Sequence, residues 1–279
     1  MTLTAETATV PFRLFDLHVV RTRRLGPSLI RITFGGEELA YFEAGGRDQS
    51  LSLFLPHPGQ RAPVLPPAVN PETWFAEYRA LPDDVRAVMR SYTVRAQRRE
   101  PDEVDIDFAL HQDGGPACRW ADRAAPGDRV AVLGPAIADN TAVRFRPPVG
   151  TDGVVLWGDE TALPALSSIL EWLPSGTPVR AWITVPFRAD RMPLPSAADV
   201  AITWLVEEEG AASPVDAVRA ETSLPGVNPY VWIAGESSSM RELRRHFVNE
   251  RQVDRRNVTF VGYWRRGRSE DQLRAEETA

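Results

Sequence analysis

The chain has 279 residues, 43% of them hydrophobic and 25% charged, with a formal net charge of −6. This composition is typical of a globular protein of one or two domains, and the acidic balance argues against a nucleic-acid-binding module. All 32 basic residues are arginine and there is one cysteine, which excludes a lysine Schiff base, an intrachain disulfide and an all-cysteine metal cluster. The N-terminus does not read as a signal peptide and no apolar run is long enough to cross a membrane, so a cytoplasmic protein is expected.

The first half of the chain contains six strand candidates. They are residues 12–23, 28–34, 50–55, 91–99, 103–111 and 128–133. In the fifth, large apolar side chains alternate with polar or small ones, which is the pattern of a half-buried strand. The Pro-rich stretch 56–71 is expected to be a surface loop, and 72–78 a short helix. Six short strands predict a small antiparallel β-barrel.

The strand candidate at 91–99, with the arginine before it, carries residues suited to a flavin. Arg90 and Arg95 supply positive charge that arginine does not lose. Tyr92 offers a planar face for stacking, and a nearby hydroxyl can bond the polar edge of the ring. Each residue also fits an ordinary role, Arg90 as a solvated strand arginine and Tyr92 as part of the core. The pattern as a whole is interpreted as a flavin-binding edge of the barrel.

A short helix is predicted after His111 and two glycines. Pro116 takes its first position, where a missing N–H group costs nothing. The free N–H groups of Ala117 and Cys118 would then point outward beside the positive end of the helix dipole. This arrangement predicts a binding site for a diphosphate.

After a Pro-rich connection at 146–150, short apolar runs alternate with helical segments. The apolar runs are 154–157, 179–185, 200–206, 230–234 and 258–261, and the helical candidates are 161–173, 215–224 and 238–251. This alternation indicates a parallel sheet covered by helices on both faces. We expect a barrel domain at 1–148 and an α/β domain at 149–279.

Two loops at the ends of these strands are expected to form a crevice for a dinucleotide, because ligands of such sheets bind at the carboxyl ends of the strands. The loops contain Gly158, Asp159, Glu160 and Thr161, and Gly235 and Glu236. No Gly-x-Gly-x-x-Gly fingerprint is present, so an ordinary Rossmann assignment is unsupported. Helix capping explains Asp159 and Glu160 as well, and it is compatible with a binding role.

Arg188 and Arg191 follow the second strand of this sheet. Two arginines at a strand end are suited to bind the 2′-phosphate of NADPH by charge-assisted hydrogen bonds. A solvated loop is an equally good interpretation, and the acidic run at 207–209 weakens the phosphate argument. The prediction is NADPH in preference to NADH.

Short motifs occur in a definite order along the chain. They read Arg-x-Tyr-Thr-Val-Arg at 90–95, Asp-Phe-x-x-His at 107–111, Gly-Pro-Ala-x-x-Trp-Ala at 115–121, Pro-Gly-Asp at 126–128, Gly-Asp-Glu-Thr-Ala-Leu-Pro at 158–164, Ala-Gly-Glu at 234–236 and Gly-Tyr-Trp-Arg-Arg-Gly at 262–267. In this order they resemble the FAD-binding siderophore-interacting proteins, which are ferric-siderophore reductases of the ferredoxin reductase-like superfamily. The resemblance covers roughly residues 11–271.

The resemblance implies a barrel that binds FAD and an α/β domain that binds NADPH or NADH. Hydride would pass to flavin N5, near Thr93, and single electrons would then pass to the Fe(III) of a ferric siderophore or chelate. Thr93 and Tyr92 are the expected catalytic residues. The expected cofactor-binding residues are Arg90, Ser91, Tyr92, Thr93, Val94, Arg95, Asp107, His111, Gly115, Pro116, Ala117, Cys118, Trp120, Gly158, Asp159, Glu160, Thr161, Arg188, Arg191, Gly235, Glu236 and Trp264. A monomer is expected, with no metal site and no nucleic-acid or membrane partner.

The chain departs from the family pattern at Gln112 and at Ala136-Ile137, where the family has glycines. His111 either contacts FAD or holds its turn, and Trp264 either shields the pocket or packs in the core. Two other functions stay open. One is a general NAD(P)H:flavin oxidoreductase with a non-iron acceptor, and the other is a non-catalytic siderophore-binding protein. Acceptor kinetics would distinguish the first from a ferric-siderophore reductase, and flavin content would distinguish the second.

Overall fold

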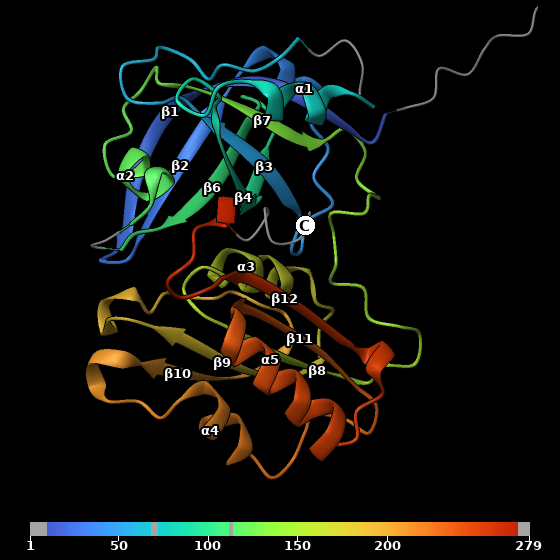
Figure 1. Cartoon of the computed structure of the whole chain (residues 1–279). Helices are drawn as coiled ribbons and strands as arrows, with labels where there is room; N and C mark the ends of the chain where they lie inside the picture. Colours follow the sequence, from blue (N-terminus) through green and yellow to red (C-terminus); the bar gives the residue numbers. More distant parts are fainter. Residues whose placement is uncertain (1–9, 68–71, 112–113, 273–279) are drawn as a thin grey trace, which may run out of the picture.

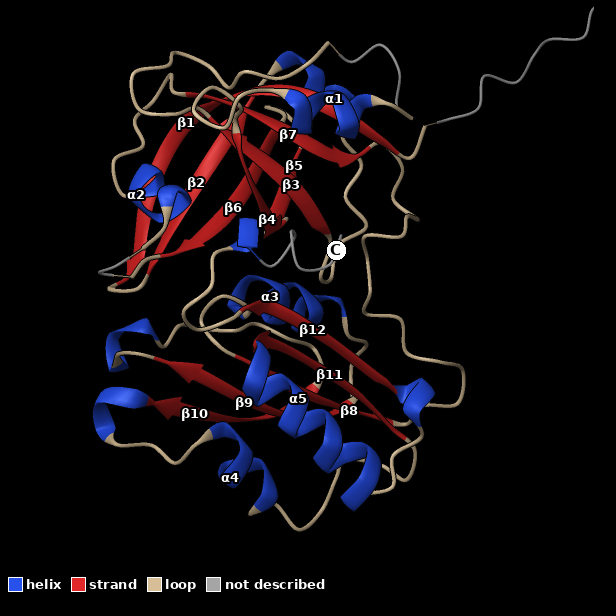
Figure 2. Ribbon diagram, viewed as in Figure 1, coloured by secondary structure: helices blue, strands red, loops and turns tan. Residues whose placement is uncertain are grey.

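A computed structural model of the chain describes residues 10–67, 72–111 and 114–272. Two domains are visible, each built on one sheet (Figure 1). The N-terminal sheet is antiparallel and curled, and the C-terminal sheet is parallel with helices on both faces (Figure 2). The expected fold class, a β-barrel followed by an α/β domain, is confirmed.

The N-terminal sheet has seven strands in the described part of the chain, in the order β4-β3-β7-β1-β2-β6-β5. Their bounds are β1 Phe12–Gly26, β2 Leu29–Gly35, β3 Ser50–Leu55, β4 Val88–Thr93, β5 Ala96–Arg98, β6 Glu103–Ala109 and β7 Arg129–Pro135. The sequence predicts six, because the candidate at 91–99 is two strands that separate at Val94 and Arg95. The sheet curls until β4 contacts β6. It thereby encloses one apolar core that includes Phe15, Leu53 and Phe108.

Two short helices flank this barrel. The helix expected at 72–78 is α1, Trp74–Ala80, and it packs Trp74 and Tyr78 against Phe54 of β3. The helix expected to begin at Pro116 is α2, Pro116–Ala121, which buries Ala117 and Ala121 in the barrel core. Proline at the first position and small apolar side chains on one face explain why the chain forms a helix there.

A ladder of ion pairs covers the face of β6 that points away from the barrel core. The pairs are Glu103 with Arg21, Asp105 with Arg98 and Asp107 with Arg31, each at 2.6 Å. All three carboxylates are buried. Burial of a charge is tolerated when it is paired and hydrogen-bonded, which is the case at each of these positions. The alternation in the sequence therefore separates a core face from a face of paired charges.

Acid should weaken this ladder. Hydrogen bonds from Arg21 above all, and from Arg98, lower the pKa of Glu103 to about 2. A carboxylate with a lowered pKa stabilises the fold above its unfolded-state pKa, and that contribution disappears as the pH falls through the folded-state value. We expect Glu103→Gln to reduce the free energy of unfolding by about 1–3 kcal/mol at pH 7, and the deficit to shrink between pH 5 and 2.

Urea unfolding at several pH values would measure this. Glu43→Gln is the control, because Glu43 pairs with Arg99 at the half-exposed surface, where ion pairs contribute little. A deficit for Glu103→Gln that does not change with pH would contradict the prediction.

Among the described residues, the C-terminal sheet has five parallel strands, in the order β10-β9-β8-β11-β12. The strands are β8 Gly153–Gly158, β9 Pro178–Val185, β10 Asp199–Val206, β11 Pro229–Glu236 and β12 Val258–Trp264, and the helices are α3 Leu163–Trp172, α4 Pro214–Arg219 and α5 Ser237–Arg245. All five strand candidates are confirmed. The three helix candidates correspond to α3, α4 and α5, but α4 ends at Arg219 and α5 at Arg245, where a π-helical segment, His246–Glu250, follows. Alternate residues of β8 face opposite cores, with Leu156 towards α3 and Val155 towards α4 and α5. Burial on both sides explains the continuous apolar runs.

The strand order reverses between β8 and β11. From β8 the chain builds outward to β9 and β10, and then returns to add β11 and β12 on the opposite side. Ligands of open α/β sheets bind at such a point, outside the carboxyl ends of the strands. Gly158 and Ala234 pair across this point, so the two predicted loops lie side by side.

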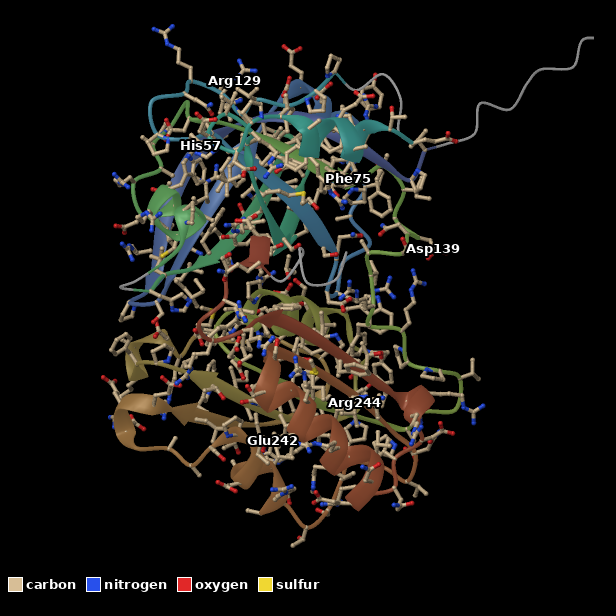
Figure 3. The ribbon with its side chains drawn as sticks, viewed as in Figure 1. His57, Phe75, Arg129, Asp139, Glu242 and Arg244 are labelled. Atoms are coloured by element: carbon tan, nitrogen blue, oxygen red, sulfur yellow. The ribbon has the colours of Figure 1, made fainter. Side chains whose placement is uncertain are left out.

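Specific contacts join the two domains, and polar side chains fill the space between the ribbons (Figure 3). Trp232 of β11 donates to Asp48 of the barrel (2.9 Å), Ser28 donates its backbone N–H to Asp190 (2.9 Å), and Arg95 pairs with Glu171 of α3 (2.6 Å). Phe145, in the connection between the sheets, is buried in the core of the α/β domain. Through these contacts the barrel meets α3, the middle of β11 and the turn after β9.

Candidate functional site

The first part of the site is the end of β4. Arg90 donates two hydrogen bonds to Asp271, at 2.9 and 2.8 Å. Ser91 donates its backbone N–H (3.1 Å) and its hydroxyl (3.0 Å) to Glu270. The donors of Arg90 and Ser91 that hold these carboxylate oxygens can hold phosphate oxygens in the same way, since a guanidinium and a backbone N–H group bind both kinds of anion. The β4 edge, defined as Arg90–Thr93, therefore fits a diphosphate.

Tyr92 and Thr93 complete the β4 edge. The Tyr92 ring lies 4.4 Å from the ring of Phe108, tilted by 46°, and is half-buried. Burial raises the pKa of Tyr92, so its phenol stays neutral. Thr93 is buried, and its hydroxyl interacts with the Tyr263 hydroxyl of β12. The edge of the barrel is thereby in direct contact with the end of the parallel sheet.

Four other residues predicted to bind the cofactor have partners within the protein. Val94 is buried in the barrel core, and Arg95 pairs with Glu171 across the domain junction. Trp120 stacks on Phe34, with ring centroids 6.4 Å apart and planes 9° apart. Asp107 is paired with Arg31 on the face of β6 opposite to Phe108 (2.6 Å). Trp120 also lies 6.0 Å from Phe108, the ring that Tyr92 contacts, so Trp120 and Tyr92 belong to one aromatic cluster.

The turn before α2 is closed by the only cysteine. The backbone N–H of His111 donates to the Cys118 sulfur (3.2 Å), and a Cβ atom at Gly114 would lie 2.2 Å from that sulfur. Glycine is therefore required at 114. Gly115 and Pro116 are exposed at the start of α2. Gln112, the departure from the family pattern, lies outside the described residues.

The second part of the site is the crevice between β8 and β11. Asp159 accepts hydrogen bonds from the backbone and hydroxyl of Thr161, from Glu236 N (2.8 Å) and from Trp264 Nε1 (2.8 Å). One carboxylate thus connects the carboxyl ends of three strands. Gly235 has φ +141°, and a Cβ atom there would lie 2.4 Å from Asp159 Oδ2. This close approach explains the Ala-Gly-Glu motif.

Glu160 points from the same loop towards the barrel. Its side chain is 9% exposed, and Oε1 lies 3.9 Å from His111 Nδ1. Burial, and then the charge of Asp159, raise the pKa of Glu160 to about 8. The ring of His111 also faces Trp264, with centroids 6.3 Å apart. The predicted residues His111, Glu160 and Trp264 are therefore brought together at the domain junction.

The two arginines predicted to bind a 2′-phosphate share one acidic partner. Arg188 Nε and Arg191 Nη2 both pair with Glu209, the latter at 3.1 Å. The backbone N–H of Arg188 also donates to Glu208 (2.6 Å). The acidic run that weakens the phosphate argument in the sequence therefore contacts both arginines directly.

Sequence reasoning missed three of the residues that join the domains. They are Asp48, Glu171 and Asp190, and none lies in a motif. The acidic pair Glu270 and Asp271 was also missed, because it follows the last motif, which ends at Gly267. Its charge was visible in the sequence, but its partner on β4 lies about 180 positions away.

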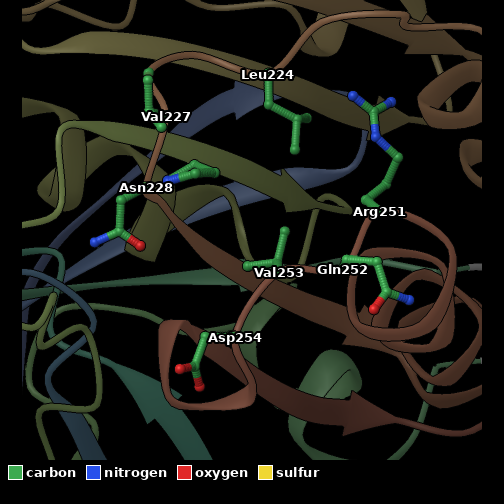
Figure 4. A pocket seen from close by; sticks show the side chains of 9 residues that line it. Leu224, Val227, Asn228, Arg251, Gln252, Val253 and Asp254 are labelled. Carbon is green, nitrogen blue, oxygen red and sulfur yellow. The ribbon is translucent and has the colours of Figure 1, made fainter.

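A separate pocket of about 300 Å³ lies at the opposite, amino-terminal end of the parallel sheet (Figure 4). The loops before β11 and β12 line it, with Asn228 and Arg251 among the residues. Its position at the amino ends of the strands separates it from the crevice. None of the described helices has the length and apolar character needed to cross a membrane.

The fold is similar to that of the ferredoxin reductase in carbazole 1,9a-dioxygenase, with a TM-score of 0.62 at 13% identity over 91% of this chain and 69% of that chain. Residues 18–139 match the siderophore-interacting FAD-binding domain, and residues 151–267 match the siderophore-interacting protein model. The chain belongs to the siderophore-interacting protein family, and its N-terminal domain binds FAD.

Named relatives cover nearly the whole chain. Ferric vibriobactin reductase ViuB of Vibrio cholerae is 30% identical over 95% of this chain and 93% of its own. The NADPH-dependent ferric-chelate reductase of Escherichia coli is 32% identical over 90% and 93%. The crystal structure of a siderophore utilization protein from T. fusca has a TM-score of 0.77 at 33% identity, over 94% of this chain and 96% of that one.

Proposed function

We propose that this protein is an FAD-dependent NAD(P)H ferric-siderophore reductase that acts as a cytoplasmic monomer and releases Fe(II) from the chelate. The observation that carries the proposal is the contact between Thr93 of the β4 edge and Tyr263 of β12. A flavin on that edge would face a nicotinamide in the β8–β11 crevice. The full-length similarity to ferric vibriobactin and ferric-chelate reductases supports the reaction.

The residues of the site have separate roles in the proposed reaction. Bound FAD would supply the conversion of a two-electron donor into single-electron steps. Arg90 and Ser91 would hold its diphosphate, together with the start of α2, and Tyr92 would pack along the ring. Thr93 would offer a hydroxyl at the ring edge, and Trp264 would exclude water. The proposed domain boundary at 148/149 falls within the connection between β7 and β8.

An absorbance spectrum of the purified protein, followed anaerobically by NADPH and then by a ferric siderophore with an Fe(II) trap, tests the function. We expect a flavin spectrum that bleaches with NADPH and returns as Fe(II) appears. Bleaching without iron reduction would favour the general flavin oxidoreductase. A lack of bound flavin even after FAD is added would favour a non-catalytic siderophore-binding protein.

The preference for NADPH has its own test. We expect Arg188→Ala to raise the KM for NADPH about tenfold and to leave that for NADH nearly unchanged, because only NADPH offers a 2′-phosphate. Glu209→Gln should lower the KM for NADPH, since it releases both arginines. Arg219→Ala is the control, because Arg219 is paired with Glu250 elsewhere on the same domain (2.9 Å). Equal effects on both dinucleotides would remove the 2′-phosphate argument.

A further inference from the structure

Glu160 has fewer partners than a buried carboxyl group requires. It interacts with its own backbone N–H group and lies 3.9 Å from His111 Nδ1. Within the described residues no other side chain donates a hydrogen bond to it. A buried carboxyl group with so few hydrogen-bond donors is costly, and in native structures such a group commonly meets a ligand or water. Its neighbour Asp159 is the opposite case, with four donors.

The charges around Glu160 favour its neutral form. Asp159 of the same loop, Asp190 at the end of the short helix Arg188–Asp190, and Glu207 after β10 all act on it. His111 is the group that faces it from the barrel. Burial, which is the largest effect, and the charges of Asp159, Glu207 and Asp190 raise the pKa of Glu160 to about 8. Burial raises the pKa of Asp159 too, while hydrogen bonds from Thr161, Trp264 and Glu236 act in the opposite direction. Because Asp159 accepts four hydrogen bonds and Glu160 accepts none from another side chain of the described residues, the geometry favours the proton of this pair on Glu160.

A protonated carboxyl group presents an O–H donor and a carbonyl acceptor side by side. A primary carboxamide presents a carbonyl acceptor and an N–H donor in the same spacing. The two groups can therefore form a pair of hydrogen bonds. Nicotinamide carries a carboxamide of this kind on its ring. In a flavin reductase the nicotinamide ring has to lie against the flavin edge, which is the side of the crevice that Glu160 faces.

We propose that Glu160 binds the carboxamide of the nicotinamide ring as a neutral acid and so orients the hydride donor at the domain junction. This inference rests on the proposed reductase function and specifies the residue that recognises the reacting end of the dinucleotide. It also predicts a pH dependence with a defined sign. Above pH 8 the carboxylate can still accept a hydrogen bond from the carboxamide N–H group, but it no longer donates one. The hydrogen bond to the carboxamide oxygen is then replaced by repulsion between two oxygens. Binding of a dinucleotide with an uncharged ring therefore weakens as the pH rises.

The test uses FAD-loaded protein and the 1,4,5,6-tetrahydro forms of NADH and NADPH, which keep the carboxamide, have an uncharged ring and do not donate hydride. Kd is measured between pH 6.5 and 9.5. We expect a rise of about tenfold for the wild type. Glu160→Gln keeps a donor and an acceptor and does not titrate, so its Kd should stay level. Glu160→Ala should bind about tenfold more weakly at pH 7, without pH dependence.

ADP-ribose and its 2′-phosphate lack the nicotinamide and serve as matched ligands. Their Kd should be the same in all three proteins, and the flavin absorbance verifies folding and FAD content. The same pH profile in wild type and Glu160→Gln, or wild-type affinity in Glu160→Ala, would overturn the inference. Wild type that binds ADP-ribose but neither tetrahydro form would also overturn it, with the reductase function intact. Failure to bind any of these ligands would overturn the reductase function itself.

Discussion

Arg90→Ala is expected to lower the affinity for FAD by roughly ten- to a hundredfold, because charge-assisted hydrogen bonds of this kind contribute about 1.5–3 kcal/mol. The Arg90 guanidinium holds two oxygens of Asp271 in the structure, and a diphosphate would take the same donors. Tyr92→Ala should also lose FAD, since it removes the ring beside Phe108. Flavin content after gel filtration and Kd by titration would measure both variants.

Arg129→Ala is the matched control. Arg129 is an exposed arginine at the start of β7, on the side of the barrel away from the α/β domain (Figure 3). Asp271→Asn should change FAD affinity in the opposite direction, because it removes a carboxylate that competes for Arg90. Wild-type flavin content in both Arg90→Ala and Tyr92→Ala would refute the assignment of the β4 edge.

Asp159→Ala is expected to reduce stability and dinucleotide binding together. The substitution leaves the part-buried donors Glu236 N and Trp264 Nε1 without an acceptor. We expect a loss of about 3 kcal/mol in the free energy of unfolding, which corresponds to a fall in Tm of roughly 6–12 °C for a chain of this size. Because the loops after β8 and β11 are then no longer connected, Kd for the dinucleotide should rise at least tenfold even where the protein is folded.

Asp152→Ala separates the two effects. Asp152 accepts the backbone N–H groups of Val227 (2.9 Å) and Asn228 (2.8 Å), at the amino-terminal end of the same sheet. Its loss should lower Tm without changing dinucleotide affinity. Thermal unfolding and equilibrium binding at 20 °C would be measured on both variants. Dinucleotide binding that stays at the wild-type level in folded Asp159→Ala would show that the carboxylate does not organise the crevice.

Much of the fold was visible in local patterns. Period-two alternation identified β6, and continuous apolar runs between helices identified the five parallel strands, because these patterns depend on which side of each strand is buried. Pro116 marked the start of α2. The division of residues 91–99 into β4 and β5 was not visible, because Val94 and Arg95 continue the pattern of a strand. Their separation depends on the burial of Val94 and on the ion pair of Arg95 with Glu171.

The sequence by itself determined the two-domain class, the ordered family motifs and the neighbourhoods in which cofactor residues lie. Only the tertiary structure decided which of those residues meet. Trp264 reaches Asp159 across 105 positions, and His111 comes to face Glu160. The first contact exists because β8 and β12 lie on either side of β11 in the parallel sheet, and the second because the barrel packs against that domain. Periodicity reports the environment of a side chain along its own strand, and it carries no information about a partner on a distant strand or another sheet.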